Sequence, residues 1–131
     1  MTLADELRVM LDKAQRYIHS ADSLRVNGDF DSAVSRLYYA MFYCTEAVLV
    51  ADGRTYSSHK AIIAAFGQHY IKTKVQPQEL HEWLREAFEK RQISDYDFMA
   101  TADEEEVLDL ASKAAHFVTS VEDYLTRTGH L

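Results

Sequence analysis

Residues 33–51 read AVSRLYYAMFYCTEAVLVA and predict an α-helix that is apolar on almost every side. Small and aliphatic residues recur every three or four positions along one face, and aromatic residues fill much of the rest. A helix of this kind lies at the centre of a bundle or is covered by another layer. We expect it to begin near Asp29 or Asp31, since aspartate is a favoured N-cap, and to end at Asp52-Gly53.

Two amphipathic helices are expected on either side of this central one in the sequence. Residues 3–24 carry an apolar stripe at helical spacing, which stops at the helix terminator Asn27-Gly28. A second stripe lies within residues 104–125, behind three glutamates that suit the positive end of a helix dipole. Thr101 or Asp103 is expected to start that helix.

The middle of the chain predicts one short helix and one longer helix. Ser57 or Ser58 can cap the short helix, which Gly67 ends or interrupts. Pro77, the only proline, suits the first turn of the longer helix. The apolar pattern of that helix weakens over residues 91–98, so we expect it to end there.

The predicted fold class is all-α. With 4 glycines and 1 proline in 131 residues, the chain has fewer turn residues than a β-sandwich would normally need. Four long amphipathic helices with short connections favour an antiparallel four- to five-helix up-and-down bundle, with the short helix at one end. No repeat or linker interrupts the pattern, which indicates a single helical domain over residues 1–131.

Metal and cofactor chemistry find no support in the sequence. A single cysteine, Cys44, excludes an internal disulfide and a zinc–cysteine site. None of the six histidines follows a glutamate by three positions, as a di-iron bundle requires. His81-Glu82 begins like a zinc protease helix, but Arg85 stands where the second histidine belongs. We expect neither a metal nor a cofactor.

The sequence also indicates a cytoplasmic protein without a membrane anchor. Its first ten residues include Asp5, Glu6 and Arg8 and lack the apolar core of a signal peptide. The longest apolar stretch, residues 40–51, is too short to span a bilayer.

The net charge of -7 argues against a stand-alone binder of nucleic-acid backbones. Residues 53–78 differ from the rest, because they contain four basic residues and no acidic one: Arg54, Lys60, Lys72 and Lys74. Such a positive island could receive a phosphate or an acidic partner. The alternative is a solvated region that happens to lack acidic residues.

Two further signals concern binding. Arg91 and Asp95 are four residues apart, so they can pair on one helical face, either as a structural ion pair or as an arginine held ready for a phosphate or nucleotide. Tyr38 and Tyr39 are adjacent, so they cannot both face one core. Together with 8 tyrosines in all, this suggests a dimer surface.

Several segments resemble landmarks of the HEPN family, in order and at sensible spacing. These segments are Ala33–Phe42, Ser58-His59-Lys60, Phe66-Gly67, Lys72-Thr73 and the late Arg-x-x-x-Asp-Tyr motif at Arg91–Tyr96. The resemblance covers most of the chain. It implies a helical bundle like the C-terminal domain of kanamycin nucleotidyltransferase, a homodimer, and often a neighbouring minimal nucleotidyltransferase in a toxin–antitoxin module.

Catalytic HEPN proteins are metal-independent ribonucleases with an arginine and, four to six residues later, a histidine. Here the positions after Arg91 hold Asp95, Tyr96 and Asp97 and no histidine. Arg54 and His59 have the right spacing but lie in another loop, and chance alone gives about one such match.

Our leading hypothesis is therefore a binding protein without catalytic activity of its own, which engages a nucleotidyltransferase, a nucleotide or RNA. The candidate binding residues are Arg91, Asp95, Tyr96, His59 and Lys60. One alternative is a metal-independent ribonuclease toxin, with His59 as the titrating group and Arg54 and Lys60 on the phosphate. The other is a purely structural bundle that mediates oligomer contacts.

Overall fold

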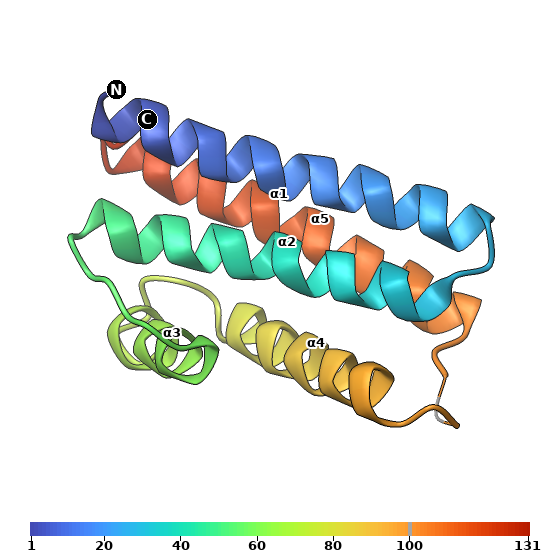
Figure 1. Cartoon of the computed structure of the whole chain (residues 1–131). Helices are drawn as coiled ribbons and strands as arrows, with labels where there is room; N and C mark the ends of the chain where they lie inside the picture. Colours follow the sequence, from blue (N-terminus) through green and yellow to red (C-terminus); the bar gives the residue numbers. More distant parts are fainter. Residues whose placement is uncertain (100) are drawn as a thin grey trace.

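The computed structural model describes residues 1–99 and 101–131 and confirms the all-α fold. The elements in chain order are α1 (Leu3–Val26), α2 (Phe30–Ala51), α3 (His59–Phe66), the π-helical turn η1 (Gly67–Ile71), α4 (Gln78–Tyr96) and α5 (Glu104–Arg127). In Figure 1 the long helices α1, α2, α4 and α5 alternate in direction, as an up-and-down bundle requires. The short α3 lies across one end of this bundle.

Helix α2 lies at the centre of the bundle, as its sequence predicts. It contacts α1, α3, α4 and α5 (Figure 1). Side chains on opposite faces are buried, among them Leu37, Met41 and Val48 and the aromatic pair Tyr38 and Phe42. A helix surrounded in this way leaves little room for polar side chains, and the buried Thr45 hydroxyl accordingly donates to the Met41 carbonyl 2.9 Å away.

Side chains cap four of the helices at their N-termini. Thr2 and Asp5 form a reciprocal capping box at α1. Asp29, Ser58 and Asp103 each accept a hydrogen bond from a backbone N–H in the first turn of α2, α3 and α5. At α2 and α3 the structure thus selects Asp29 over Asp31 and Ser58 over Ser57.

Two of the expected helix ends follow from glycine. Gly28 and Gly53 have φ angles of 79° and 73°, in the left-handed region that other residues rarely adopt. Each glycine follows the last turn of a helix, α1 or α2, and turns the chain into the next connection.

In residues 67–96 the structure confirms two expected helix ends and corrects the place of Pro77. Helix α3 ends at Phe66 with Gly67 as its C-cap, as expected, but the backbone of Gly67 is helical (φ -59°, ψ -46°) and the chain continues directly into η1. Pro77 is the N-cap of α4 rather than part of its first turn. Helix α4 ends at Tyr96, within the stretch 91–98 where its end is expected.

Candidate functional site

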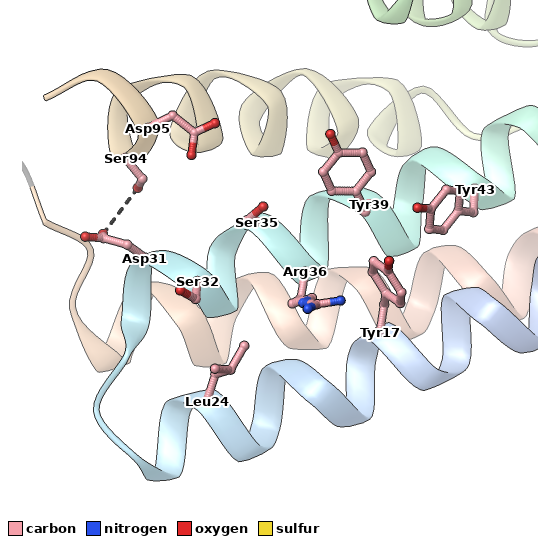
Figure 2. A pocket seen from close by; sticks show the side chains of 10 residues that line it. All are labelled: Tyr17, Leu24, Asp31, Ser32, Ser35, Arg36, Tyr39, Tyr43, Ser94 and Asp95. Atoms are coloured by element: carbon pink, nitrogen blue, oxygen red, sulfur yellow. Dashed lines mark hydrogen bonds between the residues drawn. The ribbon is translucent and has the colours of Figure 1, made fainter.

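An open groove of about 790 Å³ lies between α1, α2 and the C-terminal end of α4. We call it the tyrosine groove. Figure 2 shows its side chains: Tyr17 and Leu24 come from α1, Asp31, Ser32, Ser35, Arg36, Tyr39 and Tyr43 from α2, and Ser94 and Asp95 from α4. Aromatic rings, hydroxyls and charges of both signs therefore line one surface.

Arg91 borders this groove through two of the lining residues. Its Nη2 lies 3.3 Å from Asp95 Oδ2, which confirms the predicted pair four residues apart. Its guanidinium carbon lies 5.0 Å from the centroid of the Tyr39 ring and 5.8 Å from that of Tyr38. These contacts fix the arginine in place.

The Nε atom of Arg91 is buried and has no hydrogen-bond partner among the described residues. A buried polar donor without a partner costs about 1–3 kcal/mol. The arginine is thus held by Asp95 and two aromatic faces while part of its hydrogen-bonding capacity is unused.

His59 lies beside the same tyrosines, although it is far from Arg91 in the sequence. Its Nδ1 shares a hydrogen bond of 2.7 Å with the Tyr38 hydroxyl. Its ring stacks on Phe42, with centroids 4.1 Å apart and an angle of 18° between the planes. Burial lowers the pKa of His59, and the positive charge of Arg91 lowers it further. The structure therefore brings His59 close to Arg91, which is itself paired with Asp95.

The other two predicted residues lie at the periphery. Tyr96 is 83% exposed at the last turn of α4 and does not line the tyrosine groove. Lys60 lines a separate depression of about 470 Å³ between α3 and α4, together with Phe88 and Gln92. Neither side chain is placed by the fold against the Arg91–Asp95 pair.

Arg54, the proposed helper of His59 in the ribonuclease alternative, contacts a different histidine. Its Nη1 lies 3.4 Å from His69 Nε2. Arg91, not Arg54, is the arginine whose charge acts on His59.

A cluster of tyrosines and cations at the other side of the groove was not predicted. The Tyr17 and Tyr43 rings meet edge to face, 5.2 Å apart. The Arg36 guanidinium carbon lies 4.7 Å from the Tyr17 centroid, and Lys13 Nζ lies 4.6 Å from the Tyr43 centroid. A hydrogen bond with Tyr43, followed by the charges of Lys13 and Arg36, lowers the pKa of Tyr17. The sequence signal for this cluster was the high tyrosine content.

Asp31 holds the end of the tyrosine groove in shape. Its Oδ1 accepts a hydrogen bond from the Ser94 hydroxyl at 3.3 Å, drawn in Figure 2, and from the Ala102 backbone N–H at 2.9 Å. One carboxylate thus connects the start of α2 to the end of α4 and to the segment before α5.

Cys44 lies in the core, where burial raises the pKa of its thiol, so it remains protonated at neutral pH. Across residues 1–99 and 101–131, no three His, Cys, Asp or Glu side chains gather as they would around a metal ion. Over the same residues, no helix combines the length and the hydropathy needed to cross a membrane.

Comparison with known proteins assigns the chain to a family. The HEPN domain family matches residues 7–124. A Methanocaldococcus jannaschii protein named "Putative toxin MJ0142" is 33% identical over 120 residues, which are 92% of this chain and 82% of that protein. A Thermotoga maritima protein named "UPF0332 protein" is 36% identical over 110 residues, which are 84% of this chain and 83% of that protein. The chain belongs to the HEPN family.

Proposed function

We propose that this HEPN protein is the helical component of a two-component, toxin–antitoxin-like module and binds a nucleotide or a protein partner without catalysis of its own. The observation that carries the proposal is Arg91, which Asp95 and Tyr39 hold at the edge of the tyrosine groove. A fixed guanidinium binds a phosphate or carboxylate with less loss of side-chain entropy than a mobile one. The tyrosine rings of the groove offer faces on which a base can stack.

The relatives support the module. Two Methanocaldococcus jannaschii relatives carry the word toxin in their names, and the more similar one covers 92% of this chain. More specifically, we propose that the protein partner is a nucleotidyltransferase. It rests on the family resemblance and on the arginine-bordered groove.

The exposed apolar residues at the end of α4 and just after it, close in the sequence to the Arg91–Asp95 pair, are the surface we assign to a protein partner, and we call them the apolar patch. It consists of Ile93, Tyr96, Phe98 and Met99, all exposed, and the last two are 93% and 91% accessible. Exposed apolar side chains that cluster at one place are typical of protein interaction sites. The same patch would hold two copies together in the homodimer that we propose.

The binding proposal is tested by comparing Arg91→Ala with Arg8→Ala. Arg8 is a matched control, because it too forms one ion pair, with Glu122 at 3.3 Å, but lies on α1 away from the groove. Tagged variants are used to capture partners from the source cells, and nucleotide binding is measured by calorimetry. We expect Arg91→Ala to weaken partner or nucleotide binding at least about tenfold, a loss typical of a hydrogen bond to a charged group. Equal binding by both variants would refute the role of Arg91.

The homodimer is tested by sedimentation velocity on wild type and on the double variant Phe98→Ser/Met99→Ser. We expect a dimer for the wild type at micromolar concentration and a shift toward monomer for the variant. A wild-type monomer at that concentration, with no partner captured, would remove the patch from the proposal.

A second candidate function, metal-independent RNA cleavage, is favoured by one observation. His59 and Arg91 both contact Tyr38, one at its hydroxyl and the other above its ring. A neutral histidine can accept the proton of a ribose 2′-hydroxyl, and a nearby arginine can stabilise the charge on the phosphate. The lowered pKa of His59 keeps it neutral at physiological pH.

Ribonuclease activity is tested with labelled RNA in the presence of a chelator. Cleavage that leaves 2′,3′-cyclic phosphate ends and is lost in His59→Ala would establish the enzyme. RNA that stays intact after long incubation with the purified protein would exclude it.

A further inference from the structure

A second, larger cavity of about 860 Å³ lies at the opposite end of α4 from the tyrosine groove. It is formed by the turn after η1, the first turns of α4 and the end of α5. We call it the basic pocket. The residues that matter in it are Lys72, Lys74, Gln76, His81, Arg85 and Arg127.

The charges of the basic pocket are predominantly positive. Four of its lining residues are Lys or Arg, and its one acidic lining residue is Glu82. Glu82 already accepts a hydrogen bond from the Gln78 side chain at 3.2 Å, and Arg127 is paired with Asp123 at 3.0 Å. Lys72, Lys74 and Arg85 form no ion pair with any described residue. The pocket therefore favours an anion.

The N-terminus of α4 faces the same space. Its N-cap is Pro77, and no side chain accepts a hydrogen bond from its first N–H groups. Pro77 and Gln78 both line the pocket. The Leu80 N–H donates to the Pro77 carbonyl at 3.1 Å, whereas no described residue accepts from the N–H groups of Gln78 and Glu79. These two groups and the positive end of the helix dipole, at the start of a 19-residue helix, suit a phosphate oxygen.

Gln76 gives an independent indication of a ligand. Its side chain is 4% exposed, and its amide Nε2 has no hydrogen-bond partner among the described residues. The backbone of Gln76 is fixed, because its N–H donates to the Tyr70 carbonyl at 2.8 Å. A buried amide donor needs an acceptor, and Gln76 is one of the residues that line the basic pocket.

From these observations we propose that the basic pocket binds a phosphate-bearing ligand. The phosphate sits at the N-terminus of α4, where the Gln76 amide donates to it and Lys72, Lys74 and Arg85 surround it with positive charge. Both a free nucleotide and the 5′-phosphate end of an RNA offer this group. The pocket is separate from the tyrosine groove, so this proposal stands or falls independently of the proposed function.

The test is an NMR titration of the isotope-labelled full chain at low salt, with four probes. Pyrophosphate, ATP and a short 5′-phosphorylated RNA carry the group, and adenosine lacks it. We expect the three phosphates to shift the backbone amide signals of Gln76, Gln78 and Glu79, and adenosine to leave them unchanged. A response to ATP and pyrophosphate but not to RNA identifies a free nucleotide as the source, and the strongest response to RNA identifies a strand end.

Three variants distinguish specific binding in the basic pocket from non-specific electrostatic attraction to the protein surface. Lys72→Gln/Lys74→Gln is expected to weaken pyrophosphate binding at least about tenfold, and Gln76→Leu, of similar volume, about threefold or more. The control Arg8→Gln/Arg16→Gln removes two positive charges from α1 and should stay within about twofold of wild type. Circular dichroism and thermal unfolding confirm that each variant is folded.

Three results would overturn the proposal. One is the absence of shifts at Gln78 and Glu79 up to about 10 mM pyrophosphate, beyond the range of specific binding. Another is an equal loss of binding in the α1 control. The third is equally strong binding of a poly-glutamate peptide, since that would mark a merely basic surface.

Discussion

Tyr38 contacts both His59 and Arg91, the two groups of the candidate site that lie far apart in the sequence. Its hydroxyl meets His59, Arg91 lies over its ring, and its whole side chain is buried beside Phe42. A buried phenol needs a hydrogen-bond partner, and His59 supplies it. Burial raises the pKa of Tyr38, so the hydroxyl keeps its proton over the physiological range. A change at Tyr38 should therefore affect both stability and the site.

Replacing Tyr38 with Phe should lower the free energy of unfolding by about 1 kcal/mol, because the ring remains but its hydrogen bond to His59 is lost. Urea unfolding followed by circular dichroism measures this difference. Tyr39→Phe is the matched control on the neighbouring, partly exposed residue and should change stability less. If the two variants lose the same stability, the Tyr38–His59 contact contributes nothing specific.

Removing the charge of Arg91 should raise the pKa of His59 toward its ordinary value. The positive guanidinium disfavours a protonated imidazole, and burial alone would remain in Arg91→Ala. NMR titration of the His59 ring protons measures the shift. Arg91→Lys keeps a positive charge and should preserve most of the lowering. An unchanged His59 pKa in Arg91→Ala would mean that there is no electrostatic interaction between the two side chains.

At the scale of single helices, local chemistry explains which predictions succeeded. The caps Asp29, Ser58 and Asp103 each accept from an N–H group three residues away, so the sequence alone narrows each helix start to two candidate residues. The Arg91–Asp95 pair is local for the same reason. The meeting of His59 with Arg91 joins α3 to α4 across the surface of α2, and no spacing rule within one helix could predict it.

The sequence does not predict that the helical path continues from Gly67 to Ile71, because this depends on a residue of another helix. A Cβ built on Gly67 would lie 2.8 Å from His81 Nε2, so glycine serves here to admit a neighbouring side chain. His81 Nε2 in turn lies 3.2 Å from the Ile63 carbonyl oxygen. The side chain that occupies this space belongs to α4, which is distant from Gly67 in the sequence.

Gly67→Ala and His81→Ala should therefore be coupled in a double-mutant cycle. In the wild type, alanine at position 67 displaces the His81 ring and costs the contact with Ile63, which offsets any gain in helix propensity. In a His81→Ala background the same substitution should stabilise by about 0.5–1 kcal/mol, the usual gain of alanine over glycine in a helix. Urea unfolding of the four proteins gives the coupling energy. A value near zero would show that the ring has room to move.

For the molecule as a whole, two histidines give stability a dependence on pH. Burial is the main cause that lowers the pKa of both His59 and His81 below the ordinary value of 6.5. The unfolded chain therefore binds protons on these residues more readily than the folded one. Stability falls as the pH drops through 6.5 toward the lowered folded values, and it is fully present above that range.

We expect the urea concentration at the unfolding midpoint to decrease as the pH is lowered from 7.5 to about 6. This is the window in which unfolded histidine gains its proton. The variant His59→Gln/His81→Gln should show a flatter profile over the same window. Glu46, whose pKa burial raises, acts in the opposite direction, but it is present in both proteins and so cancels in this comparison. A steeper decline in the double variant would contradict the assignment.

The buried thiol of Cys44 can be used to detect opening of the helical bundle. Because α2 is surrounded by the other helices, a thiol reagent can reach this sulfur only when the bundle separates. The labelling rate, measured by mass spectrometry as urea is added, then reports the population of open molecules without any engineered probe. If a bound ligand or partner slows this labelling, the change in rate measures how much binding at the surface stabilises the closed bundle.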